Sequence, residues 1–150
     1  MLKVEMKGGE DARGGCESFE HTADVGLRVW APSPEELFER AALGLIELML
    51  DPACVRAERT VPVEVEGHDA EDLLVAWLQE LLYRFEAERF APARAEVDAL
   101  ARGALKGRLV GETFDPARHR VRQHVKAVTY HDLAIVRRAG LWEVRVVLDV

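Results

Sequence analysis

The sequence predicts an α+β fold in which one or more mostly antiparallel sheets carry two helices packed on one side. Two segments repeat apolar residues with the period of an amphipathic helix, and roughly seven others alternate as strands do. Most of the strand-like segments follow one another through short turns, which is typical of hairpins. At 150 residues the chain has the length of one domain with a sizeable core.

The two predicted helices cover residues 34–50 and about 69–85. Ser33 is a good N-cap for the first helix, and Pro52 follows the point where it must stop. Each helix has an apolar stripe that should face the core. The stripes consist of Phe38, Ala41, Ala42, Leu45, Ile46 and Met49 in the first helix, and of Leu74, Trp77, Leu78, Leu81, Leu82 and Phe85 in the second.

The predicted strands alternate apolar and polar residues, with Pro62 favouring an edge position for one of them and Ala139-Gly140 forming the last turn. In the final strand, Asp149 belongs to the polar face. The strands are expected over residues 17–20, 25–31, 61–65, 93–100, 104–112, 125–130, 131–137 and 141–148.

The first residues differ in character from the rest. Residues 1–17 contain two Gly-Gly pairs among charges and predict a mobile N-terminal extension, with a short strand near residues 2–6. Residues 18–150 are predicted to form the domain.

Charge and composition exclude several classes of protein. The net charge of −7 argues against stable direct binding of nucleic acid, which needs a basic face. No apolar run approaches the ~20 residues of a membrane helix, and the N-terminus does not have the apolar segment of a signal peptide. We therefore expect a cytoplasmic protein that does not associate with a membrane. Cys16 and Cys54 could form a disulfide, but reduced thiols are the simpler interpretation.

Sequence motifs of common catalytic sites are missing. The chain has no glycine-rich phosphate loop and no Gly-x-Ser-x-Gly elbow. His119, His124 and His131 do not have the spacing of a zinc site. The basic run 118–122 could contact RNA or an acidic partner, or could be a solvated connection.

Acidic residues at the two ends of the predicted domain suggest one site. Asp24 lies in the corner His21-Thr22-Ala23-Asp24, between two predicted strands, and Asp149 and Val150 end the sequence. If these ends meet, two carboxylates and the terminal carboxylate would offer the oxygen ligands that hard divalent cations prefer. The alternative is that Asp24 caps a turn and Asp149 is a solvated acid. His21 could orient the corner or simply be hydrogen-bonded.

Taken together, several motifs resemble the archease family. The similarity covers about residues 18–150, and the combination of the His-Thr-Ala-Asp corner with Lys-Ala-Val-Thr-Tyr-His and an Asp-aliphatic ending is specific. The matching segments are FEHTADVGLRVWA (19–31), DLLVAWLQELLY (72–83), ETFDPARH (112–119), VKAVTYHDL (125–133) and WEVRVVLDV (142–150).

The resemblance implies a function that the residues alone do not reveal. Archeases are accessory proteins, not enzymes, which promote guanylylation and multiple turnover of the GTP-dependent tRNA-splicing RNA ligase, a transient partner. They carry a divalent-metal site, which by position implies Asp24, Asp149 and Val150 as ligands here. Calcium is the expected ion, with magnesium or manganese as alternatives. The implied fold is a sandwich-like α+β domain.

Two other functions are compatible with the sequence. The protein could be a general chaperone or scaffold for RNA-modifying proteins that needs no metal. A metal-dependent hydrolase ranks last, because no general base or nucleophile accompanies the carboxylates. Lys126, Thr129, Tyr130 and His131 could shape the acidic site or serve in strand packing.

Overall fold

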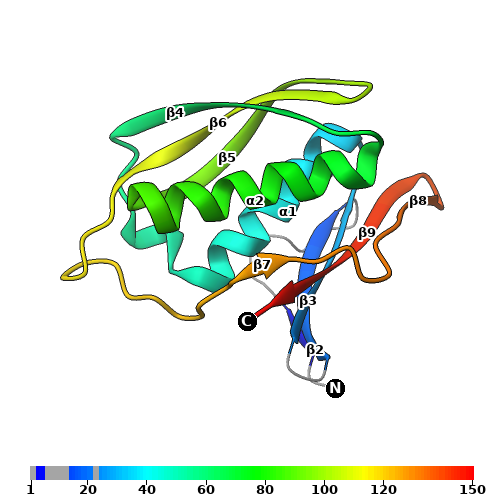
Figure 1. Ribbon diagram of the computed structural model, residues 1–150. Helices are drawn as coiled ribbons and strands as arrows, with labels where there is room; N and C mark the ends of the chain where they lie inside the picture. The colour runs from blue at the N-terminus through cyan, green and yellow to red at the C-terminus, as the bar shows by residue number, and fades with distance from the viewer. Residues whose placement is uncertain (1–2, 6–13, 22–23) are drawn as a thin grey trace.

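The computed structural model describes residues 3–5, 14–21 and 24–150, which form two sheets with two helices between them (Figure 1). The larger sheet has the order β1-β2-β3-β9-β7, and β8 pairs with the same edge of β9 as β7. All of its pairs are antiparallel. Its strands are β1 (Lys3–Glu5), β2 (Gly15–His21), β3 (Asp24–Ala31), β7 (Ala127–Val128), β8 (Ile135–Arg138) and β9 (Leu141–Asp149).

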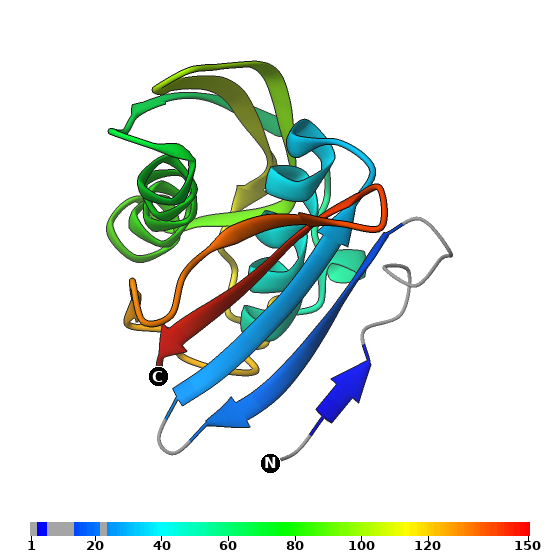
Figure 2. The same ribbon diagram turned by 90° about the vertical axis from the view of Figure 1, so that its right-hand side faces the viewer.

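The smaller sheet has the order β4-β6-β5 and is also antiparallel. Helix α1 contacts both β3 and β5, whereas α2 contacts the smaller sheet and β7 (Figure 2). Each sheet therefore carries helices on one face, and the α+β expectation is confirmed. These elements are β4 (Arg59–Glu66), β5 (Phe90–Ala101), β6 (Ala104–Thr113), α1 (Pro34–Met49), the short 3-10 helix η1 (Pro52–Cys54) and α2 (Ala70–Glu88).

Side-chain caps set the start of both helices where the sequence predicts them. The Ser33 hydroxyl accepts the N–H of Glu36 at 3.2 Å, and the Asp69 carboxylate accepts the N–H of Asp72 at 2.7 Å. These bonds satisfy donors that the first helical turn leaves open. All predicted stripe residues are buried except Phe85, which is half-buried.

A buried hydrogen bond joins the two helices. The indole N–H of Trp77 on α2 donates to the carbonyl oxygen of Phe38 on α1 at 3.0 Å. Both side chains are almost fully buried. Because a buried polar group needs a partner, this bond fixes how α2 lies against α1.

Strand β9 has the alternation that the sequence predicts. Val144, Val146 and Leu148 face the helices and are buried, while Arg145 and Asp149 are exposed on the other face. β3 lies along one edge of β9, and β7 and β8 lie along the other. The end of β9 is therefore held from both sides.

The structure differs from the sequence expectation in three places. Gly15 and Cys16, assigned above to the extension, belong to β2, which thus begins two residues before the expected strand 17–20. The strands expected over 125–130 and 131–137 shrink to β7 and β8. Between them the chain turns, with Leu133 N–H bonded to Tyr130 O at 3.2 Å and a positive φ of 50° at Asp132.

The two cysteines occupy different environments and do not form a disulfide with each other. Cys16 packs in the core against α1, and burial raises the pKa of its thiol to about 12, so it is unreactive. Cys54 is exposed in η1. Within the described residues, no helix has the length and apolar character needed to cross a membrane.

Candidate functional site

Asp24 and Asp149, remote in sequence, lie directly opposite each other. β3 begins at Asp24 and pairs antiparallel with β9, and the register places Asp24 across from Asp149. Directly opposed residues of an antiparallel pair have Cβ atoms roughly 4.5–5.5 Å apart and on the same face of the sheet. The two carboxylates therefore extend side by side from the end of the larger sheet, a region that we call the acidic tip, formed by Asp24, Asp149 and Val150.

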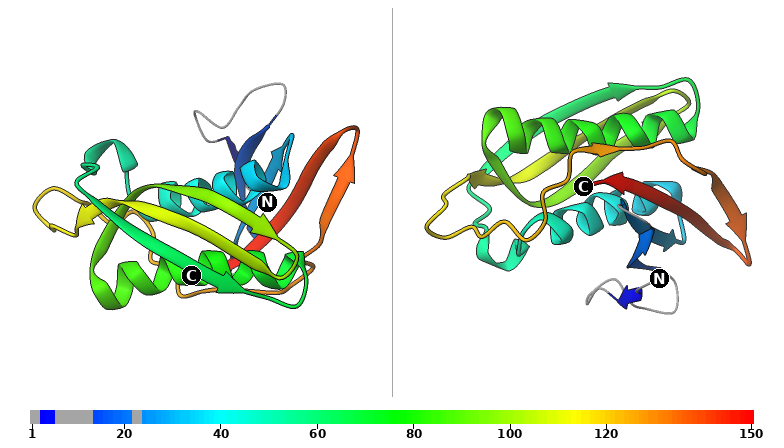
Figure 3. Two further views of the ribbon diagram at one scale, coloured as in Figure 1. Left: turned by 90° about the horizontal axis from the view of Figure 1, so that it is seen from above. Right: turned by 60° about the horizontal axis from the view of Figure 1, so that its bottom comes forward.

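The remaining residue of the acidic tip is fixed by β7. Asp149 is paired with Ala127, and the backbone N–H of Lys126 donates to the Asp149 carbonyl at 2.8 Å. Val150 is partly buried against the core. Its main-chain oxygens thus follow directly after Asp149, where the chain end emerges between β3 and β7 (Figure 3).

The carboxylates of the acidic tip lack cationic partners. Within residues 3–5, 14–21 and 24–150, neither Asp24 nor Asp149 forms a side-chain hydrogen bond or an ion pair. Asp149 is exposed and Asp24 half-buried. Like charges directly opposed across two strands repel each other. A cation between them would remove that repulsion.

The donor set fits a hard divalent cation. The two carboxylates of Asp24 and Asp149 and the main-chain oxygens beside them are ligands of the kind that such cations prefer. In the described part of the chain, no group of three His, Cys, Asp or Glu side chains gathers in a metal-binding arrangement. A cation at the acidic tip would thus need main-chain oxygens and water besides Asp24 and Asp149.

Other residues expected at this surface have structural partners. Thr129 donates its hydroxyl to the Val147 carbonyl at 3.0 Å, and Tyr130 donates its hydroxyl to the carboxylate of Asp72 on α2. The side chain of His131 is largely exposed. Thr22, Ala23 and the side chain of His21 lie outside the described residues, so the corner's own geometry stays a prediction.

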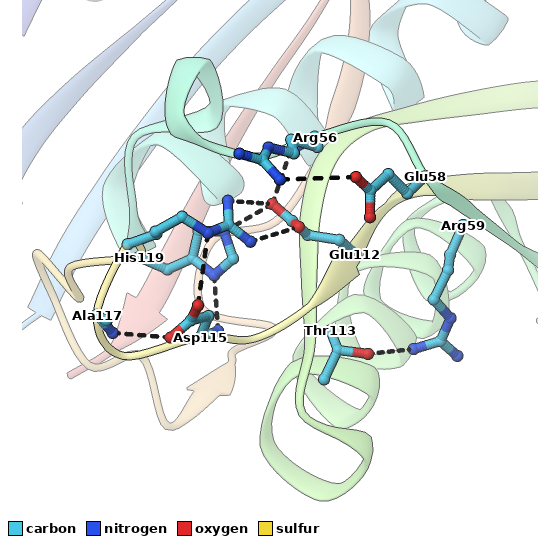
Figure 4. Close-up of polar contacts among 9 residues, drawn as sticks. Arg56, Glu58, Arg59, Glu112, Thr113, Asp115, Ala117 and His119 are labelled. Carbon is cyan, nitrogen blue, oxygen red and sulfur yellow. Dashed lines mark hydrogen bonds and ion pairs between the residues drawn. The ribbon is translucent and has the colours of Figure 1, made fainter.

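A second polar cluster lies at the C-terminal end of β6 (Figure 4). The sequence analysis did not predict it. Glu112 is only 4% exposed and receives two bonds from the guanidinium of Arg118, at 2.6 and 3.0 Å. The backbone N–H of Arg56 donates to it at 2.8 Å. Chiefly because of Arg118, the pKa of Glu112 lies far below its ordinary value.

His119 completes this cluster, which we call the Glu112 cluster (Arg56, Glu112, Arg118 and His119). Its Nδ1 accepts the backbone N–H of Asp115 at 2.8 Å, so the ring proton is on Nε2, which donates to Glu112 at 2.9 Å. His119 is 2% exposed. Because Glu112 and His119 are almost fully buried and bonded to each other, the cluster fastens the 114–126 connection to the smaller sheet.

The same contacts change the interpretation of the basic run 118–122. Arg118 is paired with Glu112, and Arg122 donates to the carbonyl of Glu47 and pairs with Asp51. The run is therefore in part a structural connection. The sequence signal that could have revealed the Glu112 cluster is the segment from Glu112 to His119, in which an acid, a base and an imidazole lie within eight residues.

Comparison with known proteins finds a family model and several relatives that match most of the chain. A model of the archease protein family (MTH1598/TM1083) matches residues 17–150. Proteins named archease from Methanopyrus kandleri and Pyrococcus furiosus are 40% and 37% identical to the chain, in each case over 89% of this chain and 97% of the relative. The protein from Thermococcus gammatolerans is 39% identical over 89% of this chain and 96% of its own length.

Solved structures share the fold. The solution structure of protein 1598 from Methanobacterium thermoautotrophicum has a TM-score of 0.74 and 35% identity, covering 89% of this chain and 96% of that one. The crystal structure of an archease from Thermotoga maritima, described as a possible chaperone, has a TM-score of 0.60 at 23% identity and covers 88% of this chain and 94% of that one. At this identity the likeness supports the fold alone. By family model, sequence identity and fold, the chain belongs to the archease family.

Proposed function

We propose that this protein is a non-catalytic activator of the GTP-dependent tRNA-splicing RNA ligase, and that it promotes guanylylation and repeated turnover of the ligase through a divalent cation held at the acidic tip. The observation that carries the proposal is the register of β3 and β9, which opposes Asp24 and Asp149, neither of which forms an ion pair within the described ranges. Membership of the archease family supports the same function.

The acidic tip is suited to present oxygen ligands at the end of a stiff support. Asp24 and Asp149 belong to adjacent strands, and both β3 and β9 are paired along two edges. Their carboxylates are thus held at a fixed spacing, with Asp149 the more accessible to a partner. A bound divalent cation would offset negative charge on the phosphates of GTP during nucleotidyl transfer. The protein's own residues would position that charge against the ligase without taking part in bond making.

A guanylylation assay tests the proposal. The cognate ligase is incubated with labelled GTP and with wild-type protein, Asp24→Asn or Asp149→Asn, each of which keeps the side-chain volume but removes one negative charge. We expect each variant to lose most of the stimulation. Glu64→Gln, which removes an exposed acid from the smaller sheet, is the matched control and should stimulate as the wild type does. Full stimulation by correctly folded tip variants would remove the acidic tip from the mechanism.

The role of Val150 has a separate test. If its terminal carboxylate is a ligand, a Gly-Ser extension after Val150 displaces that charge and should weaken calcium binding by about tenfold, as loss of a carboxylate ligand does. Titration calorimetry with Ca²⁺ and Mg²⁺ measures the affinity. Equal affinity of the extended and unextended proteins would exclude the terminal carboxylate as a ligand.

We propose a general chaperone function as the second candidate; the Thermotoga maritima archease is itself described as a possible chaperone. Such a protein would hold unrelated unfolded clients and would need no cation. Light scattering of heat-denatured client proteins distinguishes the two functions. Suppressed aggregation that survives Asp24→Asn and a chelator would support the chaperone function.

A further inference from the structure

A cavity of about 590 Å³ opens at the end of the molecule remote from the acidic tip. It lies where the first turns of α1 and α2 approach the β5–β6 turn and the β8–β9 hairpin, on the right in Figure 1. Its volume lies within the roughly 300–1,000 Å³ of ordinary ligand pockets. We call it the helix-start pocket, and it is lined by Pro34, Leu37, Phe38, His68, Asp69, Ala70, Leu73, Leu100, Ala101, Arg102, Gly103, Ile135 and Trp142.

The floor and walls of the helix-start pocket are apolar. Leu37, Phe38 and Leu73 form a floor that is at most 2% exposed. Leu100, Ile135 and Trp142 are only partly buried, although they pack against the core. Because these three side chains stay in contact with water, an apolar occupant of the cavity would complete their burial.

The rim of the helix-start pocket carries the guanidinium of Arg102 and the carboxylate of Asp69. Arg102, in the β5–β6 turn, is exposed and forms no ion pair within the described ranges. The acids at the start of α2 accept hydrogen bonds from neutral groups and form no ion pair with Arg102: Asp69 caps the helix, Asp72 accepts bonds from His68 N–H and Tyr130, and Glu71 accepts the N–H of Ile135. Arg102 is thus available to an incoming carboxylate.

The distribution of polar groups favours a protein segment over a small molecule. Small-molecule sites orient their ligand with polar groups that converge inside the cavity. Among the described residues, no buried side-chain nitrogen or oxygen lacks a partner, and the polar groups of this pocket lie at its rim. Ala70 and Ala101 are exposed at the opening. This arrangement suits an apolar side chain whose own backbone remains outside.

We infer that the helix-start pocket receives a large apolar side chain from a partner protein, with an Asp or Glu beside it that pairs with Arg102. That the partner is the RNA ligase rests on the proposed function. The chemistry of the contact rests only on the residues of the pocket. Trp142 and Asp149 are seven residues apart on β9, about 24 Å at the rise of a strand. The pocket would therefore hold the partner at a distance from the acidic tip, as an anchor separate from the activating residues.

A dipeptide probe tests the contact without the ligase. Acetyl-Phe-Asp-amide is titrated into the ¹⁵N-labelled protein and followed by NMR, with acetyl-Phe-Asn-amide as the neutral probe. We expect shifts at the amides of Leu73, Ala101 and Gly103 and at the Trp142 indole, with the Asn probe about fivefold weaker, as loss of one exposed ion pair implies. Arg102→Glu should remove the preference for Asp, whereas Arg120→Glu, an exposed charge on the distant 114–126 connection, should keep it.

Two results of the dipeptide titration would overturn the inference. One is that acetyl-Phe-Asp-amide causes no shifts at the helix-start pocket, even at the highest concentrations at which it does not yet bind elsewhere on the protein. The other is equal affinity for the Asp and Asn probes, which would show that Arg102 does not select a carboxylate.

The ligase assay then asks whether the pocket acts as an anchor. Ala101→Trp should fill the opening and raise the concentration of protein needed for half-maximal guanylylation by roughly tenfold, the effect of losing one anchor side chain. The maximal stimulation should stay unchanged, in contrast to Asp24→Asn. A folded Ala101→Trp protein with wild-type half-maximal concentration would refute the anchor. If even the wild type fails to stimulate the ligase, the proposed function fails, and the dipeptide result decides the pocket independently.

Discussion

At the scale of single residues, the acidic tip lowers the stability of the folded protein when no cation is bound. Asp24 and Asp149 carry like charges at opposed positions, and no cationic side chain among the described residues lies in contact with either. Removal of one charge should therefore stabilise the cation-free protein by on the order of 0.5 kcal/mol. We predict that Asp149→Asn raises the melting temperature in EDTA and abolishes the further rise that calcium produces in the wild type.

Differential scanning calorimetry with EDTA and with increasing calcium measures both effects. Saturation at about 100 times the dissociation constant should stabilise the wild type by ~2.7 kcal/mol. Glu64→Gln controls for a general change in net charge. A calcium-dependent shift of equal size in Asp149→Asn and wild type would contradict the prediction.

A second prediction at this scale concerns pH and the Glu112 cluster. The pKa of Glu112 is lowered in the folded protein, first by Arg118 and then by the N–H of Arg56, against the opposing effect of burial. A carboxyl whose pKa is lower when folded contributes stability above its unfolded pKa and loses that contribution as pH falls toward its folded pKa. The contribution should be complete at pH 7 and decline progressively below the ordinary value of 4.5.

Urea unfolding of wild type and Glu112→Gln at several pH values measures this dependence. The difference in unfolding free energy between the two proteins should be large at pH 7 and smaller at pH 3. A difference that stays constant between these pH values would show that the ionised form of Glu112 is not what stabilises the fold.

These two residue-scale sites differ in how far the sequence could predict them. Asp24 and Asp149 each lie at the end of a strand with clear alternation, so their meeting required only that the two strands pair. The Glu112 cluster depends on Arg56, which lies 56 residues earlier in the sequence. It also depends on the burial of Glu112 and His119, which the alternation of polar and apolar residues does not indicate. Its basic residues therefore looked like a solvated run.

At the scale of elements, the bond between Trp77 and Phe38 fixes the relation of the two helices. Trp77→Phe removes the indole donor and leaves a small cavity beside the Phe38 carbonyl. We expect a loss of about 2 kcal/mol in the free energy of unfolding. Chemical denaturation checks this value, and Tyr83→Phe on the exposed side of α2 is the control. Equal stability of Trp77→Phe and wild type would contradict the prediction.

Helices were predicted better than the strands near the end of the chain. The caps Ser33 and Asp69 act within three residues, so the sequence contains the whole interaction. Segments 125–130 and 131–137 alternate as strands do, yet the chain turns between them. Tyr130 bonds to Asp72, which lies 58 residues earlier, and Ile135 bonds to Glu71, 64 residues earlier. Such distant contacts to α2 shorten the strands and leave no periodic signal.

At the scale of the whole molecule, the acidic tip and the helix-start pocket lie toward opposite ends of β9. They share no residue, so their contributions should be independent. We predict that the double variant Asp24→Asn, Ala101→Trp combines the lower maximal stimulation of the first change with the higher half-maximal concentration of the second. Guanylylation rates over a range of protein concentrations measure both. A double variant that matches either single variant would show that the two regions act as one.

The position of the acidic tip within the larger sheet has a consequence for its dynamics. Asp24 and Asp149 begin and end two interior strands, so their backbones can separate only if the β3–β9 ladder opens at that end. Opening of interior strands approaches global unfolding in free energy. Calcium should therefore slow amide hydrogen exchange throughout β3 and β9, as far as Val29 and Val144, and not merely beside the ion.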